Sequence, residues 1–389
     1  MTGAPAVHLG QEAAFSRAVF DGRVTAARAA LAARGIDVMV VTGPENIFYL
    51  TGQQTPGYYT FQALVLPVSG EPRFIVRQLE SMNCRANTYL DDLVAYGDGD
   101  DPLALLSDIT RKAAGPTGKV GIDKRGWFLP IGVYETLQGT LGDMVDAAGV
   151  IESLRAVKSP EEVAKIAQAA RYVDAGIAAG YDAITAGATE NDMVAAMLEA
   201  AVRAGSEYLG MEPLASSGPR SGVPHGTWKR RRFEAGDPVF LEMAACHDRY
   251  HAVLMRSAWL GTPPDDALRM MDACQRALDA ALGAMKPGNT CEQVHEAAQA
   301  VIDAAGYTDA YRKRTGYSVG ISFAPDWGEW QVASLFTGIK TELKPGMVFH
   351  VPPALRLYGA YTVGVSETVV VTEDGYRALG TIPRDLRVI

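Results

Sequence analysis

Two short stretches at the starts of helices decide the fold of this chain: Gly187-Ala188-Thr189-Glu190-Asn191-Asp192 and Gly288-Asn289-Thr290-Cys291-Glu292-Gln293. Each stretch leads into an alanine-rich helical pattern, which ends near Gly205 in the first copy and near Gly306 in the second. The Gly, Thr and final Gly of the two copies recur at the same offset of 101 residues. Each Thr is placed to cap its helix through its hydroxyl oxygen. The repeat predicts a domain of two matched halves, and the shared caps argue against a chance repeat between alanine-rich helices.

Apolar runs typical of strands follow both copies of the repeat. The runs after the first copy are Pro238–Met243 and Tyr250–Leu260, and those after the second are Gly316–Phe323, Gly346–Val351 and Ser366–Val371. Two matched helix-plus-strand halves are expected to share a sheet.

The first part of the chain alternates helical and strand patterns instead. A helix is predicted over Phe20–Arg34, and strands over Val38–Val41, Ala63–Pro67, Arg73–Val76 and Lys119–Asp123. A boundary falls before Ser159-Pro160-Glu161-Glu162, where Ser159 can cap a long helix and Glu162 can close a capping box. We therefore expect an α/β domain over residues 12–155 and a second domain over residues 156–389.

Composition limits the partners of the protein. The net charge of −9 argues against nucleic acid and anionic membranes as partners. The basic run Lys229–Arg232 is expected to be a solvated turn, with an anion or subunit contact as the alternative. The four cysteines lack CxxC spacing, and the chain shows neither a signal peptide nor a long apolar stretch. These features predict a cytoplasmic protein with reduced thiols.

Several motifs resemble the prolidase/methionine aminopeptidase/creatinase family. They are Ser216–His225, Phe240–Met243, Arg249–Arg256, Gly316–Gly320, Lys344–Phe349 and Ser366–Thr372. The resemblance implies an α/β (α+β) fold, with a creatinase-like N-terminal domain and a C-terminal pita-bread domain built as a pseudo-two-fold repeat.

The same resemblance implies that the metal ligands of the family are missing. Family peptidases bind two metal ions with two Asp, one His and two Glu. At those positions this chain has Glu242, Val253, Tyr317, a residue near Pro352, and Glu367. Because two metal ions need several carboxylates to offset their charge, we expect no metal and no other cofactor.

Further segments resemble the metal-free branch of the family. Arg249–His251, Arg314–Tyr317, Pro325–Glu329, Phe349–His350 and Ser366–Glu367 are similar to ectoine hydrolases, and Gly316–Ser318 and Thr341–Met347 to creatinases. The implied function is metal-independent hydrolysis of a C–N bond in a small polar cyclic amidine or amide. The alternatives are a creatinase-like amidinohydrolase acting on a guanidino compound, an Xaa-Pro peptidase-like protein without metal, and a non-catalytic binding module.

Three residues are expected to be catalytic. His225 would deliver a proton to the leaving nitrogen, since imidazole titrates in the useful range. Glu242 would act as general base or nucleophile, and Glu367, opposite it, would bind a cationic group of the substrate. The alternatives are a structural His225, a Glu242 that is the buried partner of Arg256, and a Glu367 that is a vestige of the metal site.

The expected substrate-binding residues are Tyr317, Asp326, Trp327, Glu329, His251, His350, Tyr58 and Tyr59. Tyr317 could donate a hydrogen bond or fill space, and Trp327 could cover a small ring or serve as a packing anchor. His251 and His350 alternate with apolar residues, a pattern more typical of core histidines. Tyr58 and Tyr59 lie in the loop Gln53–Gln62, which in the creatinase branch reaches the active site of the partner subunit, so a homodimer is expected.

Overall fold

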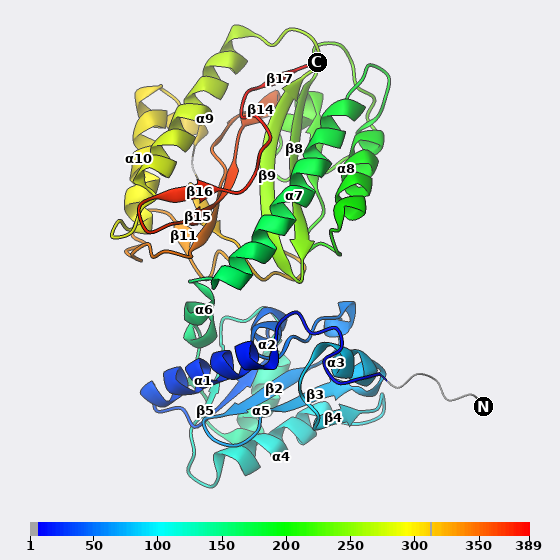
Figure 1. Cartoon of the computed structure of the whole chain (residues 1–389), viewed down its shortest axis with the longest axis vertical. Helices are drawn as coiled ribbons and strands as arrows, with labels where there is room; N and C mark the ends of the chain where they lie inside the picture. The colour runs from blue at the N-terminus through cyan, green and yellow to red at the C-terminus, as the bar shows by residue number, and fades with distance from the viewer. Residues whose placement is uncertain (1–6, 312) are drawn as a thin grey trace, which may run out of the picture. The chain divides into compact units, whose positions relative to one another are not determined.

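The structure is a computed structural model that describes residues 7–311 and 313–389 (Figure 1). The chain divides into two compact units, and the division falls between Arg155 and Ala156. In the described residues no helix has the length and apolar character needed to cross a membrane. All four cysteines are free and buried.

The first unit is built on one six-stranded mixed sheet of order β4-β3-β2-β1-β5-β6. Its strands are β1 (Val38–Val41), β2 (Ala63–Pro67), β3 (Arg73–Arg77), β4 (Leu93–Tyr96), β5 (Val120–Ile122) and β6 (Val145–Asp146). β1 pairs antiparallel with β2 and parallel with β5. The four strands predicted from apolar runs are confirmed, whereas β4 and β6 were not predicted.

Helices cover both faces of this sheet. They are α1 (Arg17–Ala33), α2 (Pro44–Thr51), α3 (Ser81–Asn87), α4 (Pro102–Ala114), α5 (Ile131–Leu141) and α6 (Val150–Arg155), with the 3-10 turns η1 (Pro56–Tyr59) and η2 (Gln78–Glu80). Figure 1 shows α4 on the opposite side of the sheet from α1 and α2. The α/β class predicted for this part of the chain is confirmed.

The second unit contains two helix pairs and two main sheets. The helices are α7 (Pro160–Ala183), α8 (Glu190–Ala204), α9 (Asp265–Ala284) and α10 (Cys291–Ala304), with the 3-10 turns η3 (Gly218–Gly222) and η4 (Thr308–Ala310). One sheet has the order β17-β9-β8-β7, from β7 (Leu214–Ser217), β8 (Pro238–His247), β9 (Tyr250–Trp259) and β17 (Arg387–Val388). The other has the order β11-β10-β12-β15-β16, from β10 (Gly316–Ser318), β11 (Ser334–Leu335), β12 (Val348–Val351), β15 (Glu367–Val371) and β16 (Tyr376–Ala378). A separate hairpin joins β13 (Ala354–Leu357) to β14 (Tyr361–Gly364).

The internal repeat is visible in the backbone. Thr189 closes a capping box with Asp192 at α8, and Thr290 closes one with Gln293 at α10. The residue after each Thr donates from its backbone N–H to a carbonyl of a later loop, Glu190 to Arg231 at 2.9 Å and Cys291 to Thr341 at 2.9 Å. The two halves therefore repeat their caps, as the sequence predicted, and their loop contacts. The prediction that they share one sheet is wrong, because their strands form two separate sheets. Ser159 and Glu162 also form the predicted capping box at α7.

Close packing of α7 on β8 fixes which face of that strand meets the helix. A Cβ atom at Gly180 would lie 2.9 Å from Leu241 Cδ2, and one at Gly176 would lie 2.5 Å from Met243 Sδ. Because successive side chains of a strand point to opposite faces, Glu242 points away from α7.

The second half buries its strands against α9 and α10 in the same way. Phe349, Val351 and Val369 belong to the core that these helices cover. His350 and Thr368 are cross-strand partners at the alternate positions, so their side chains point to the other face of this sheet.

Candidate active site

Glu242 is a buried carboxylate without a bonded partner. Its side chain lies in the middle of β8 and the residue is only 8% exposed. Among the described residues none forms a hydrogen bond or ion pair with it. Burial raises the pKa of Glu242, and the positive charges of Lys313 and Arg356 oppose that rise. An unpaired buried carboxylate is costly to keep, which makes Glu242 the strongest candidate for a chemical role.

Arg256 is not the partner of Glu242. Leu241 pairs with Arg256 across β8 and β9, whereas Glu242 pairs with Met255, so Arg256 and Glu242 lie on opposite faces. The alternative interpretation of Glu242 as the buried partner of Arg256 is therefore wrong.

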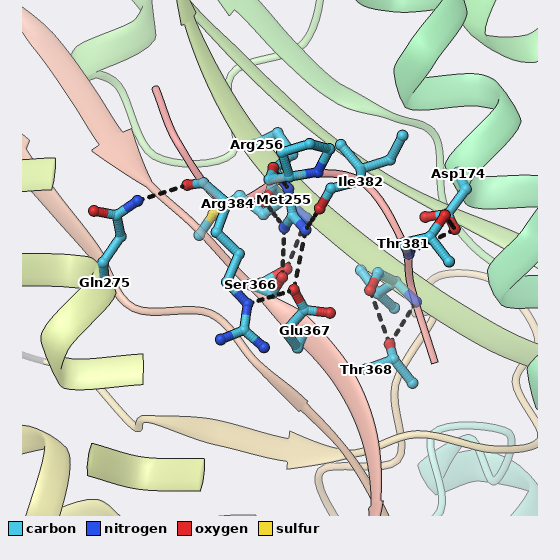
Figure 2. A network of polar contacts seen from close by, with 12 residues as sticks. Asp174, Met255, Arg256, Gln275, Ser366, Glu367, Thr368, Thr381, Ile382 and Arg384 are labelled. Carbon is cyan, nitrogen blue, oxygen red and sulfur yellow. Dashed lines mark hydrogen bonds and ion pairs between the residues drawn. The ribbon is translucent and has the colours of Figure 1, made fainter. Parts of the chain in front are cut away.

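Arg256 instead binds Glu367, as Figure 2 shows. Glu367 Oε1 accepts hydrogen bonds from Arg256 Nη2 at 3.0 Å and from Arg384 Nε at 2.9 Å. Arg384 also pairs with Asp279 of α9. Arg256 additionally donates to the carbonyl oxygens of Ile382 and Pro383, which ties the C-terminal segment to β9.

Glu367 therefore does not lie opposite Glu242. Its cross-strand partner is Val351, on the side of the sheet that α9 and α10 cover. The expectation that the two carboxylates share one site is wrong, because the pleat of β15 turns Glu367 to the helix side. The preceding residue, Ser366, points to the other side.

Ser366 belongs to a chain of hydrogen bonds that links β9, β12 and β10. Its Oγ accepts from the backbone N–H of Met255 at 2.7 Å, and it lies 2.7 Å from His350 Nε2. His350 Nδ1 lies 3.0 Å from Tyr317 Oη, which accepts a hydrogen bond from Trp327 Nε1 at 2.8 Å. Tyr317, Trp327 and His350, all expected in the site, are thus brought together. Ser366 was not predicted, although it directly precedes the Glu367 that the resemblance favoured.

The ionisable side chains of this hydrogen-bond network, His350 and Tyr317, are favoured in their neutral forms. Burial lowers the pKa of His350 far below its usual value, and the nearby Lys313 and Arg256 lower it further. Burial also raises the pKa of Tyr317 well above its usual value, and the charge of Glu242 adds to the rise. A neutral phenol there can donate a hydrogen bond but cannot bind metal as the family histidine would.

His225 follows η3 in an exposed loop and has a backbone φ of 54°. Partial burial lowers its pKa, and Arg356 and Lys313 lower it further. These are the same two cations that act on Glu242. The imidazole is thereby favoured in its neutral form.

Lys313 and Arg356 were missed by the sequence analysis. Lys313 Nζ donates to the carbonyl oxygen of Pro352 at 2.6 Å, and burial lowers its pKa to about 8. Arg356 lies in β13, where it stands among apolar neighbours. The sequence did contain a signal for Arg356. It is a cation within an apolar run, in the segment Pro352–Tyr358 that departs from the ectoine-hydrolase pattern.

Glu329 and Asp326 have local structural partners. Glu329 forms a buried ion pair with Lys158 at 2.8 Å and accepts from the backbone N–H of Ile321. Both of its oxygens are engaged in such bonds, and its expected place in the substrate site stays a prediction. Asp326 accepts from the backbone N–H of Gly328 and shapes the loop that carries Trp327.

His251 is a satisfied core residue, as its alternation with apolar neighbours indicated. Its Nε2 accepts from the backbone N–H of Gly210 at 3.1 Å, and its Nδ1 lies 2.9 Å from the carbonyl oxygen of Arg249. Burial lowers the pKa of His251 to about 3. Both ring nitrogens are thus engaged within the fold, and its expected contact with substrate stays a prediction.

Tyr58 and Tyr59 lie in η1 of the first unit. The Tyr58 ring makes an edge contact with Phe128 at 5.5 Å between centroids, and Tyr59 is 78% exposed. Their contact with a partner subunit stays a prediction.

The residues present do not fit a two-metal site. Across residues 7–311 and 313–389, no three His, Cys, Asp or Glu side chains are placed to hold a metal ion together. The charged groups that act on Glu242 are the cations Lys313 and Arg356. Hard metal ions need several oxygen ligands and are repelled by such cations.

Comparisons with known proteins agree with this architecture. Residues 164–373 match the model of metallopeptidase family M24, and residues 23–157 match the creatinase/prolidase N-terminal domain. An ectoine hydrolase of Halomonas elongata is 29% identical, covering 96% of this chain and 98% of that protein. The dipeptidase PepE of Mycobacterium ulcerans superposes with a TM-score of 0.84 at 28% identity over 96% of this chain and 99% of that one.

A prolidase of Thermococcus sibiricus superposes with a TM-score of 0.86 at 23% identity, over 95% of this chain and 99% of that one, and so shares the fold. The fold and the site define a two-domain enzyme of the pita-bread class. The chain belongs to metallopeptidase family M24, whose relatives here are hydrolases.

Proposed function

We propose that this protein is a metal-independent hydrolase that opens a C–N bond in a small polar cyclic amidine or amide, as an ectoine hydrolase does. The observation that carries the proposal is Glu242, a buried carboxylate that forms no hydrogen bond or ion pair with any residue that the structure describes and on which the charges of Lys313 and Arg356 act. A metallopeptidase would place further carboxylates there. The similarity to the Halomonas ectoine hydrolase over nearly the whole of both chains supports the same reaction class.

The neighbours of Glu242 supply the parts that such a hydrolysis needs. Glu242 takes a proton from water as the water oxygen bonds to the amidine carbon, or its own oxygen bonds to that carbon first and water breaks the new C–O bond after the ring has opened. The phenol of Tyr317, which accepts a hydrogen bond from Trp327, can donate to the developing tetrahedral centre. When the ring C–N bond breaks, the leaving nitrogen takes a proton that the neutral imidazole of His225 relays from Glu242 or from water. The products are an open-chain amide and an amine.

A dipeptidase is the second candidate, because relatives that share the fold are named as dipeptidases and prolidases. The two candidates differ in their need for metal. A peptidase of this family would bind the peptide carbonyl at metal ions, for which Glu242 and its cationic neighbours provide no matching ligand set.

A substrate panel separates these candidates. Purified protein treated with EDTA is incubated with ectoine, creatine and Ala-Pro, and products are followed by amine release and mass spectrometry. The proposal expects ring opening of ectoine at a rate that EDTA leaves unchanged. Cleavage of Ala-Pro that is lost in EDTA and restored by Mn²⁺ or Co²⁺ would establish the peptidase instead, and urea release from creatine would establish the amidinohydrolase.

A further inference from the structure

The hydrogen bonds around His350 fix which of its two ring nitrogens carries the proton. The residue is fully buried, and both ring nitrogens have a partner: Ser366 Oγ lies 2.7 Å from Nε2, and Tyr317 Oη lies 3.0 Å from Nδ1. Burial lowers the pKa of His350 far below its usual value, so the imidazole carries a single proton. The imidazole is therefore the donor in one of these two contacts and the acceptor in the other.

Each end of this network receives a hydrogen bond whose direction cannot change. At one end, the backbone N–H of Met255 donates to Ser366 Oγ at 2.7 Å. At the other end, Trp327 Nε1–H donates to Tyr317 Oη at 2.8 Å. A backbone amide nitrogen and an indole nitrogen act only as donors. The hydroxyl hydrogens of Ser366 and Tyr317 can therefore point only to His350 or to a group outside the network.

The network holds one more donor hydrogen than it has hydrogen bonds, so one hydroxyl lacks an acceptor among the described residues. With the His350 proton on Nε2, that hydroxyl would be Ser366, which is 0% exposed. With the proton on Nδ1, it is Tyr317, which is half-buried. A hydroxyl hydrogen without an acceptor costs most where water cannot reach it, so the Nδ1–H tautomer is the more stable one.

Strand register places this network next to the strand pair that carries Glu242. The backbone N–H of Ser366 donates to Met255 O at 3.1 Å, in addition to the bond that Ser366 Oγ accepts from Met255. Met255 is the cross-strand partner of Glu242, so these two side chains are neighbours on one face. Tyr317 and His350 are cross-strand partners in the same way, in β10 and β12.

We propose that Ser366 and His350 are positioning residues that direct the O–H of Tyr317 out of the network. The Ser366 hydroxyl donates to His350 Nε2 and thereby holds the imidazole proton on Nδ1. The Nδ1–H of His350 and the Nε1–H of Trp327 then occupy both lone pairs of Tyr317 Oη. The phenol is left with its own hydrogen to donate, so this position takes an acceptor atom of a bound molecule and not an ammonium group. The inference rests on the proposed function only for the identity of that acceptor, an atom of the tetrahedral centre.

The tautomer can be measured without substrate, in protein that contains ¹⁵N-labelled histidine. Long-range ¹H–¹⁵N correlation spectra distinguish protonated from unprotonated ring nitrogens, and the His350 signals are those lost in His350→Asn. We expect the wild type to carry the proton on Nδ1, and Ser366→Ala to populate the Nε2–H form because the donor to Nε2 is gone. The control, Thr368→Val, removes another buried hydroxyl of β15 that bonds to β9, and should keep the Nδ1–H form. A wild-type proton on Nε2 would overturn the inference.

Turnover of ectoine shows whether Ser366 acts through Tyr317. Tyr317→Phe should lower kcat by about 10²- to 10³-fold, as is typical when a donor to the transition state is removed. Ser366→Ala should lower kcat by about 10-fold with little change in KM, since the Tyr317 donor is redirected for part of the time. Ser366→Thr keeps a hydroxyl and should restore most of this loss. The double variant should be no slower than Tyr317→Phe, whereas losses that multiply would contradict a route through Tyr317.

The two readouts separate failure of this inference from failure of the proposed function. If His350 carries its proton on Nδ1 and the protein does not turn over ectoine, the inference stands and the proposed substrate is wrong. If ectoine is turned over and the proton lies on Nε2, or the two losses multiply, the inference is wrong and the proposed function stands.

Discussion

At the scale of single residues, the site depends on how each ionisable group is paired. Glu242 is buried without a bonded partner, whereas Glu329 and Glu367 are buried in ion pairs. Unpaired burial is what a structural carboxylate avoids, because the desolvation of its charge is then not offset. The contrast with these two ion-paired glutamates supports the catalytic role that is proposed for Glu242.

The unpaired state of Glu242 should lower stability at neutral pH. Its pKa is raised in the folded protein, so the folded state binds the proton more tightly than the unfolded chain does. That contribution to stability is present below the unfolded pKa of about 4.3 and is lost as pH rises through the folded pKa. Glu242→Gln should therefore raise the melting temperature at pH 7 by about 2–4 °C, and hardly change it at pH 4.

Thermal melts at the two pH values check this prediction, with the exposed Glu373→Gln as the matched control. A Glu242→Gln protein that melts below the wild type at pH 7 would contradict it and would mark Glu242 as a stabilising residue.

At the scale of elements, strand pleat decides which residues reach the site. β15 turns Ser366 toward His350 and Glu367 toward α9, and β8 turns Glu242 away from α7. Two consecutive residues at the start of β15 therefore serve different regions. The Ser366 hydroxyl belongs to the candidate site, whereas the Glu367 carboxylate binds Arg256 on the other side (Figure 2).

Glu367→Gln should therefore act on stability rather than on substrate binding. It leaves Arg256 buried with its charge unpaired, which typically costs about 3–5 kcal/mol when one partner of a buried pair is removed. Urea unfolding should show this loss, while the KM of the folded variant for its substrate stays within about twofold of wild type. A KM raised tenfold or more without loss of stability would return Glu367 to the substrate site.

The elements themselves were largely predictable, because their signals are local. The caps at Ser159, Thr189 and Thr290 and the apolar runs of β1, β8 and β15 lie within short windows of sequence. The placement of Glu367 was not predictable from resemblance, because its face is set by the pleat of a strand whose register depends on distant partners. Lys313 and Arg356 were missed because their charges act on Glu242 through the fold and not through spacing along the sequence.

At the scale of the whole molecule, each of the two units has its own core. The expected homodimer depends on the loop Gln53–Gln62 of the first unit, which is expected to reach the partner subunit. Tyr59 is 78% exposed in η1, which leaves its ring available to a partner. A large exposed aromatic side chain is a common anchor of protein interfaces.

We expect the protein to sediment as a dimer at micromolar concentration. Tyr59→Ala should lower kcat/KM by about 10-fold or more if the loop completes the partner's site, since such anchors carry about 1–2 kcal/mol or more. Trp127→Ala, which removes another exposed aromatic ring of the same unit, serves as the control. A stable monomer with full activity would end the dimer prediction.

The most direct test of the whole account is the turnover number of Glu242→Gln. The amide keeps the shape of the side chain but cannot accept a proton from water or form a bond to the substrate carbon. With ectoine as substrate and the wild type measured in parallel, kcat should fall by about 10²- to 10⁴-fold, as is typical when a catalytic acid or base is removed. A variant that retains more than about a tenth of the wild-type kcat would contradict the account, and the base would then have to be sought elsewhere.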